Sequence, residues 1–102
     1  MSIKKQYLKT NPVCKVTFRL EPEEAQNAKS VHIVGEFNNW NKQKTPMKRL
    51  KNGAFTLTLD LEPKRQYQFR YLIDQHIWAN DAAADHYAPT EFAGTDNSVV
   101  IL

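Results

Sequence analysis

The fold is decided by the stretch Gln-Tyr-Gln-Phe-Arg-Tyr-Leu-Ile at residues 66–73. Its side chains alternate between polar and apolar at nearly every step, which is the pattern of a β-strand with one face on a core and the other in water. The outward set is Gln66, Gln68 and Arg70, and the core-facing set is Tyr67, Phe69, Tyr71 and Ile73. We therefore expect residues 66–73 to form a half-buried strand.

The same period of two recurs on both sides of this stretch. Residues 15–20 alternate between charged or hydroxyl side chains and apolar ones, residues 31–37 form a more apolar run, and residues 98–102 end the chain as another expected strand. Two further runs, 47–50 and 54–61, flank Asn52-Gly53, a dipeptide that tolerates the positive φ angles of a tight hairpin turn. The core face of the second run would carry Phe55, Leu57, Leu59 and Leu61. Short strands at this spacing predict an all-β fold, an antiparallel β-sandwich.

Two segments do not fit the strand pattern. Residues 21–30 have helix-forming composition but lack an apolar stripe, so we expect a polar connection with one helical turn. Residues 1–12 are expected to form an N-terminal arm, which leaves residues 13–102 as a single domain.

Composition limits the class of protein. A chain of 102 residues allows one domain and is too short for a catalytic barrel with its own substrate cleft. The net charge of +3 is too small a surplus to indicate nucleic acid by itself. Cys14 is the single cysteine, and the sequence has neither a signal peptide nor an apolar run of about 18 residues. We expect a cytoplasmic protein that does not bind membranes.

Trp40 is the first candidate for a binding side chain. It follows an expected strand and is flanked by polar residues, with Asn38 and Lys42 at the alternate positions where a core tryptophan would have apolar neighbours. We therefore favour an exposed binding aromatic over a core residue at this position.

Trp78 allows two interpretations, which depend on the turn before it. If Asp74-Gln75-His76 form a three-residue hairpin loop, Leu72 lies opposite Trp78, and the indole shares a face with Arg70. A two-residue loop would instead pair Trp78 with Tyr71 on the core face. The sequence alone does not decide between the two.

Two outward indoles beside Arg70 and glutamine amides would suit a sugar. The C–H groups on the face of a pyranose ring pack on an indole, while guanidinium and amide groups hydrogen-bond the hydroxyls at the rim. The plainer alternative is that Arg70 and the glutamines form an ordinary solvated sheet face.

Three stretches together resemble one known family. They are Val31-His32-Ile33-Val34-Gly35-Glu36-Phe37-Asn38-Asn39-Trp40, then Tyr67-Gln68-Phe69-Arg70-Tyr71-Leu72-Ile73-Asp74 with Trp78 and Asn80-Asp81, and then Gly94-Thr95-Asp96-Asn97-Ser98-Val99-Val100. Their order and content are similar to those of the family 48 carbohydrate-binding modules. That family includes the N-terminal early-set domains of isoamylases and glycogen-branching enzymes, and the glycogen-binding domain of the AMP-activated protein kinase beta subunit. The resemblance covers roughly residues 13–102.

The resemblance implies an immunoglobulin-like early-set β-sandwich and a particular set of binding residues. The two tryptophans of the family site are matched by Trp40 and Trp78, its basic residue by Arg70, and its late loop by Phe92, Thr95 and Asn97. Two departures stand out. The family turn is usually Asp-Gly, whereas Asp74 is followed here by Gln75 and His76, and Phe92 stands where a leucine is expected.

Catalysis and metal binding find little support. Glycoside hydrolysis needs two carboxylates about 5 to 10 Å apart across a cleft, and a sandwich of this size offers a groove instead. The histidines His32, His76 and His86 are scattered and lack zinc-ligand spacing. We expect no enzyme activity, no metal and no cofactor.

The sequence therefore predicts a free-standing cytoplasmic module that binds α-1,4-linked glucan, either glycogen, starch or a maltooligosaccharide. One alternative is an interaction module that docks onto a glycogen-metabolic enzyme or another protein without binding sugar itself. A second alternative, a single-strand nucleic-acid binder that uses stacked aromatics, is disfavoured, and we expect no nucleic-acid partner. Binding of the protein to insoluble starch would distinguish glucan binding from the first alternative. An affinity that falls steeply with salt would instead indicate the second.

Overall fold

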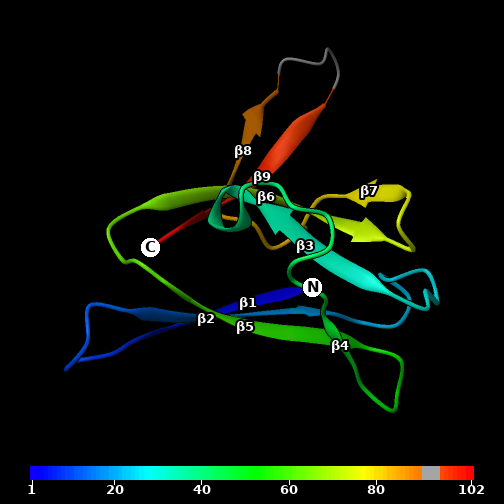
Figure 1. The fold of residues 1–102 in the computed structure, drawn as a ribbon, viewed down its shortest axis with the longest axis horizontal. Helices are drawn as coiled ribbons and strands as arrows, with labels where there is room; N and C mark the ends of the chain where they lie inside the picture. Colours follow the sequence, from blue (N-terminus) through cyan, green and yellow to red (C-terminus); the bar gives the residue numbers. More distant parts are fainter. Residues whose placement is uncertain (91–94) are drawn as a thin grey trace.

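A computed structural model describes residues 1–90 and 95–102 of the chain. Two antiparallel sheets pack face to face, and Figure 1 shows them as a lower and an upper layer. The lower sheet has the strand order β1-β2-β5-β4. Its strands are β1 (Ser2–Tyr7), β2 (Cys14–Leu20), β5 (Phe55–Leu61) and β4 (Lys48–Arg49). The expected all-β antiparallel sandwich is confirmed.

The upper sheet has the order β3-β6-β9-β8, with a short strand β7 also paired to β6. Its strands are β3 (Val31–Gly35), β6 (Gln66–Ile73), β7 (Ile77–Ala79), β8 (His86–Pro89) and β9 (Asp96–Ile101). One 3-10 turn, η1 (Glu36–Asn38), follows β3, and no α-helix occurs among the described residues. No helix in that part of the chain is long and apolar enough to cross a membrane.

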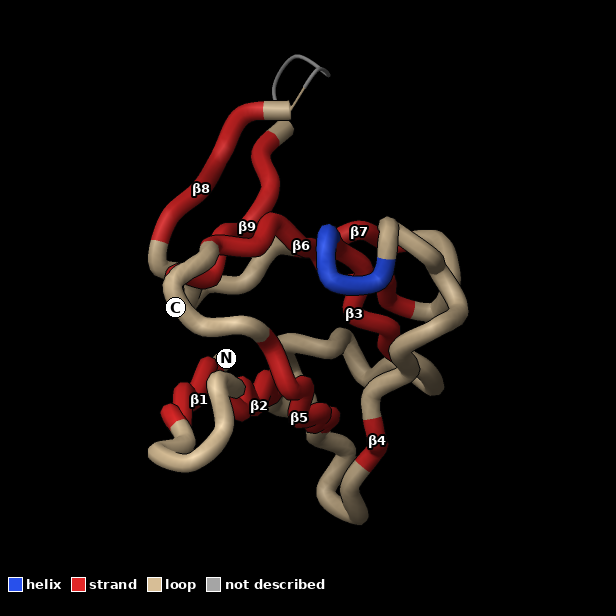
Figure 2. Tube along the Cα trace, turned by 60° about the vertical axis from the view of Figure 1, so that its left-hand side comes forward, coloured by secondary structure: helices blue, strands red, loops and turns tan. Residues whose placement is uncertain are grey.

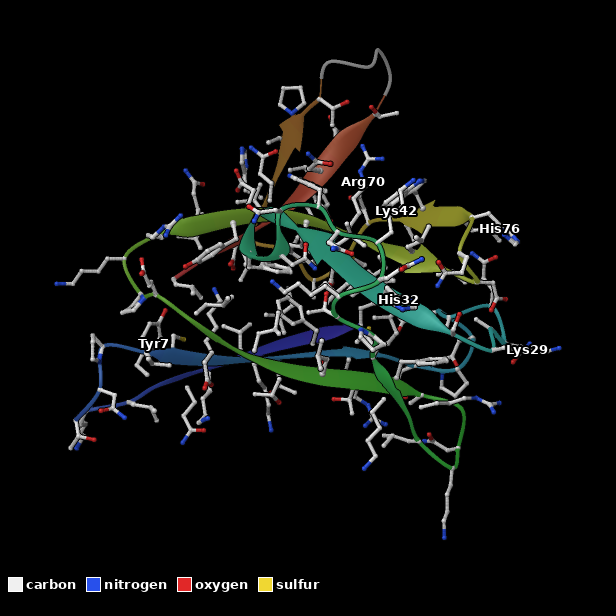
Figure 3. The ribbon with its side chains drawn as sticks, viewed as in Figure 1. Tyr7, Lys29, His32, Lys42, Arg70 and His76 are labelled. Carbon is white, nitrogen blue, oxygen red and sulfur yellow. The ribbon has the colours of Figure 1, made fainter. Side chains whose placement is uncertain are left out.

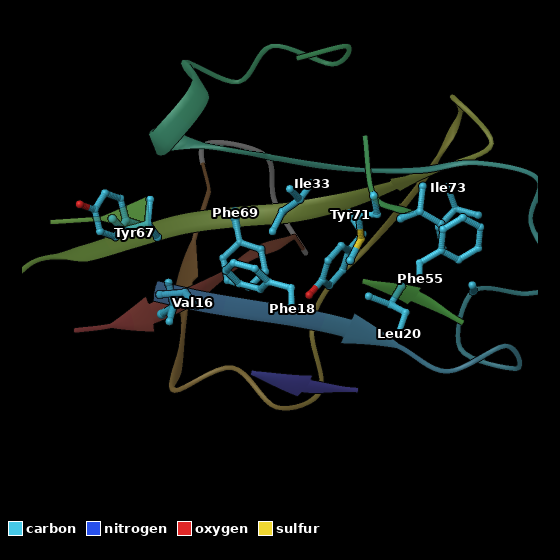
Figure 4. Packing of buried hydrophobic residues seen from close by; sticks show 14 of the residues in the cluster. Val16, Phe18, Leu20, Ile33, Phe55, Tyr67, Phe69, Tyr71 and Ile73 are labelled. Atoms are coloured by element: carbon cyan, nitrogen blue, oxygen red, sulfur yellow. The ribbon is translucent and has the colours of Figure 1, made fainter. Parts of the chain in front are cut away.

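Strand β6 lies at the centre of the upper sheet. Its alternate residues Tyr67, Phe69, Tyr71 and Ile73 are all buried, as the pattern predicts. The Phe69 ring meets the Phe18 ring of β2 edge to face, with centroids 5.2 Å apart, and the Tyr71 ring at 5.7 Å. Figure 4 shows these rings between the two layers. The contact between Phe69 and Phe18 therefore joins the two sheets near the middle of β6.

Strand β5 is less buried than its pattern predicts. Phe55 and Leu61 at its ends are buried, whereas Leu57 and Leu59 are partly exposed and pack against the edge of the core. The connection at residues 21–30 is a series of turns, as expected, and it contributes two buried alanines, Ala25 and Ala28.

The segment expected as an N-terminal arm contains a strand of the lower sheet. Strand β1 pairs with β2 from Ser2 opposite Arg19 to Tyr7 opposite Cys14. The Lys5 ammonium donates to the Asp85 carboxylate at 2.6 Å and so connects this edge strand to the upper sheet just before β8. The sequence of β1 is mostly polar, as is typical of an edge strand with one edge facing solvent.

Strands β8 and β9 form a hairpin that extends beyond the sandwich (Figure 2). The pairing runs from His86 opposite Val99 to Pro89 opposite Asp96. Strand β7 pairs with the other end of β6, at Tyr71–Ile73, so the hairpin and β7 lie apart along the same sheet (Figure 1).

A buried carboxylate lies between β7 and β8. Asp81 is fully buried and accepts hydrogen bonds from the Tyr71 hydroxyl and, at 2.7 Å, from the Ala83 N–H. Its own N–H donates to the Ser98 hydroxyl at 2.8 Å. Burial raises the pKa of Asp81 above its ordinary value, while the hydrogen bonds from Tyr71 and Ala83 oppose this shift without cancelling it.

The first prediction concerns the core. Phe69→Ala should lower the free energy of unfolding by about 3 kcal/mol, because it opens a ring-sized cavity between the sheets. Trp40→Ala should cost less than Phe69→Ala, because Trp40 is 39% exposed whereas Phe69 is fully buried. Leu57→Ala should fall between them. Urea unfolding followed by circular dichroism compares the three variants, and equal losses at Phe69 and Trp40 would show that Trp40 is a core residue.

The second prediction concerns the dependence of stability on pH. A carboxyl group whose pKa is higher in the folded state binds protons more readily there, so its contribution to stability is lost as the pH rises through that pKa. Wild type should therefore gain stability relative to Asp81→Asn as the pH falls from 7 towards about 4, the ordinary range of an aspartate. Thermal melts of both proteins at matched pH measure the difference. A constant difference across this range would contradict the raised pKa.

Candidate functional site

A groove lies on the outer face of the upper sheet, where two neighbours of β6 separate. Strand β9 pairs with β6 as far as Phe69, and β7 pairs with it from Tyr71 onward, so Arg70 lies at the fork between them. The groove has a volume of about 750 Å³. It is lined by Glu36, Trp40, Gln68, Arg70, Trp78, Pro89, Thr90, Thr95 and Asn97.

The loop before Trp78 resolves the two alternatives that the sequence leaves open. Ile73 lies opposite Ile77 and Leu72 opposite Trp78, so the loop has three residues and Trp78 shares a face with Arg70. The indole is 41% exposed. The loop lacks glycine, yet Asp74 and Gln75 both adopt positive φ angles. The Asp74 carboxylate accepts from the backbone N–H groups of Lys29 and Ser30 at 2.9 and 3.1 Å, which holds this conformation.

Trp40 reaches the groove through an unusual backbone conformation. Both Asn39 and Trp40 lie in the left-handed region, with φ of 56° and 57°. This region is uncommon for a bulky side chain and costs about 1–3 kcal/mol, so other contacts must fix it. The Trp40 N–H donates to the Gly35 carbonyl at 2.9 Å, which closes the turn around η1.

Asn38 is the residue that holds this turn. It is 4% exposed, although its polar character beside Trp40 had indicated a solvated segment. Its Oδ1 accepts from the Gly35 N–H at 3.1 Å, and its Nδ2 donates to the Ile33 carbonyl at 3.0 Å and to the Thr45 hydroxyl. The exposure of Trp40 was predicted correctly, but the polar neighbour on which that prediction relied is a buried anchor.

Gly35 lets β3 approach β6 closely just before the turn. A Cβ atom at this position would lie 2.5 Å from the Gln68 carbonyl oxygen and 2.7 Å from the Phe69 Cβ. These distances are shorter than real contacts, and one of the atoms belongs to the backbone of the central strand. Only glycine therefore fits between the end of β3 and β6.

Glu36 extends the contact with β6 beyond Gly35, where the pairing of β3 with β6 ends. Its Oε1 accepts from the Gln68 backbone N–H at 2.7 Å, so a side chain replaces the next backbone partner of β6. The Glu36 side chain is exposed and lines the groove. The alternation pattern gave no signal for this role, because the contact joins residues 32 positions apart.

Three polar side chains form a chain of hydrogen bonds along the groove floor. The Arg70 Nε–H donates to Asn97 Oδ1 at 2.8 Å, and Asn97 Nδ2 donates to Gln68 Oε1 at 2.9 Å. All three side chains are half-buried. The guanidinium plane is therefore fixed at the fork, and Figure 3 shows Arg70 on the outer side of the upper sheet.

The remaining expected residues have mixed outcomes. Thr95 lines the groove, and its hydroxyl shares a hydrogen bond with that of Thr90. Phe92 lies outside the described residues. Sequence reasoning missed Lys42, whose ammonium lies 5.8 Å from the centre of the Trp78 ring. It also missed Glu36, Pro89 and Thr90 as lining residues.

The described residues contain no group of three side chains suited to holding a metal ion. The His32 ring instead pairs with the Gln75 amide at 3.1 Å, next to the loop that presents Trp78.

Comparison with known proteins finds two similarities. The family model described as carbohydrate-binding module 48 (isoamylase N-terminal domain) matches residues 15–88, a range that includes Trp40, Arg70 and Trp78 and ends before Thr95. The 1,4-alpha-glucan branching enzyme of Photobacterium profundum is 46% identical over 46 residues, which are 44% of this chain and 6% of that enzyme. The chain therefore matches only a small part of the enzyme's length.

The third prediction tests the close approach at Gly35. Gly35→Ala should destabilise the fold by about 2 kcal/mol, because the new methyl group must push β3 away from β6. The displacement should also raise the exposure of Trp40, which a red shift of its fluorescence would report. Gly53→Ala provides the control, because it strains a turn with φ of +91° in the other sheet. A red shift of the same size in both variants would contradict a local role for Gly35.

Proposed function

Because this chain belongs to the carbohydrate-binding module 48 family, we propose that it binds α-1,4-linked glucan in the groove at the β7–β9 fork. The ligand would be glycogen, starch or a maltooligosaccharide. The observation that carries the proposal is the pair of half-exposed indoles, Trp40 and Trp78, which come from different elements and line one groove.

The two indoles supply the apolar part of sugar binding. Each presents a flat, electron-rich face, and the C–H bonds on one side of a glucose ring are its natural complement. Large exposed aromatics are costly in water, so the strained backbone at Trp40 is consistent with a side chain kept outward for a ligand.

The floor supplies the polar part. The Arg70 guanidinium has four N–H groups besides the one donated to Asn97, and they can reach hydroxyl oxygens in a fixed fork geometry. We propose that Asn97 and Thr95 also contribute, from the hairpin side of the groove. The family resemblance adds Phe92 to the proposed set. Arg70, Asn97 and Thr95 line it together with the indoles.

Two arguments favour an α-1,4 linkage: the name of the related branching enzyme and the shape of the glucan chain. The branching enzyme's name states that it acts on 1,4-alpha-glucan. Chains of this linkage curve helically, and two indoles presented by separate elements, one after η1 and one on β7, suit a curved chain. Flat β-1,4 chains prefer coplanar aromatics.

We propose that the module binds without catalysing a reaction. Glycoside hydrolysis needs a pair of carboxyl groups at the cleaved bond. Among the described residues lining the groove, Glu36 alone carries a carboxylate, and one of its oxygens is held by the Gln68 N–H. We also propose a glycogen-metabolic enzyme as a further partner, since the related segment is a small part of such an enzyme.

The fourth prediction tests the site by calorimetry. Maltoheptaose should bind with a dissociation constant of about 10 μM to 1 mM, because a shallow groove recovers little beyond the cost of ordering a flexible sugar. Trp40→Ala and Trp78→Ala should each remove about 1 to 3 kcal/mol, enough to abolish measurable binding. Arg70→Ala should remove a similar amount, and Asn97→Ala somewhat less.

Cellohexaose and insoluble starch are the controls for this experiment. Cellohexaose should give no heat, and the protein should sediment with starch to the same extent at low and high salt, because the sugar is neutral. Equal heats from both oligosaccharides, or unchanged binding by Trp78→Ala, would remove the proposal. Failure to sediment with starch would favour the protein-docking alternative.

A further inference from the structure

We infer that Gln68 is a further ligand-contacting residue of the groove, donating through its side-chain Nε2 group to glucan hydroxyls. The inference rests on the proposed glucan function. Its basis is the direction of the hydrogen bonds along the groove floor, which the chemistry of Arg70 determines.

A guanidinium group has N–H donors and no acceptor, so the Asn97 atom that meets Arg70 Nε must be the amide oxygen. The amide nitrogen of Asn97 must then face Gln68. A nitrogen that carries hydrogens requires an acceptor, so the Gln68 atom at 2.9 Å from it is Oε1. The orientation of both amides therefore follows from one unambiguous anchor.

These hydrogen bonds use the side-chain oxygen of Gln68 and leave its side-chain Nε2 group for a ligand. The side-chain oxygen accepts from Asn97, and the backbone N–H donates to Glu36 Oε1 at 2.7 Å. The Nε2 group carries two N–H donors, and the half-buried Gln68 side chain lines the groove. Gln68 thus adds donors of fixed direction beside those of Arg70.

The ligand class follows from this polarity. The floor offers donors from Arg70 and Gln68, and the Glu36 carboxylate at the rim offers acceptors. A hydroxyl group can both accept and donate, so a neutral sugar with neighbouring free hydroxyls satisfies the floor and the rim together. Gln68 would favour ligands that carry such hydroxyls, while the indoles would recognise the face of the sugar ring.

The experiment compares two substitutions of Gln68, with maltoheptaose as the probe. Gln68→Glu keeps an oxygen to accept from Asn97 but removes the Nε2 donors, whereas Gln68→Met removes both. If Gln68 contacts the ligand, both variants should bind about 3- to 10-fold more weakly than wild type at pH 7, which is the loss of one hydrogen bond. If Gln68 only supports Asn97, Gln68→Glu should keep the wild-type affinity, and that result would overturn the inference.

Gln66→Glu is the matched control for charge. Gln66 lies two residues earlier on the same face of β6, opposite Ile101, and does not line the described groove. Its variant should bind as wild type does, and a loss equal to that of Gln68→Glu would overturn the inference. Thermal melts verify that each variant is folded. Absence of binding by the wild type would instead count against the proposed function itself.

Discussion

The close approach of β3 to β6 at Gly35 is the constraint on which the groove depends. A side chain there would collide with the backbone of the central strand, and the same point ends the β3–β6 ladder. From it the chain turns through η1, where Glu36 takes over the next N–H of β6 and Asn38 anchors the turn. Trp40 is placed outward as a result. The packing of two strands thus positions a rim carboxylate and an aromatic wall.

Much of the fold could be predicted from local pattern. The alternation at residues 66–73 identified the central strand and its buried face, because burial on one side of a sheet imposes a period of two. The strand β1 was not predicted, because a short edge strand with several polar side chains looks like an arm. The alternation of polar and apolar residues also does not predict the partial exposure of Leu57, since this depends on where the facing sheet ends.

The site was predicted in part, and for reasons of different strength. The face of Trp78 depends on whether the loop has two or three residues, and the sequence does not specify this because Asp74 and Gln75 adopt positive φ without being glycine. The hydrogen bonds that Gln68 donates to Glu36 and that Arg70 donates to Asn97 require the register of strands distant in sequence. Asn38 shows the opposite case, in which a polar residue was interpreted as a sign of solvent and is buried because its amide satisfies the turn.

The fork in the pairing of β6 has a further consequence for how a ligand is received. A hollow formed where β9 and β7 diverge is bounded by backbone ladders, so it exists without a cavity in the sandwich core and does not collapse when empty. The free and bound forms should therefore superimpose closely on the floor and on the Trp78 wall, and little conformational entropy is lost there on association. Under the proposed function, the module would act as a rigid template for the sugar, and the ordering of the flexible glucan chain would account for most of the entropic cost of the complex.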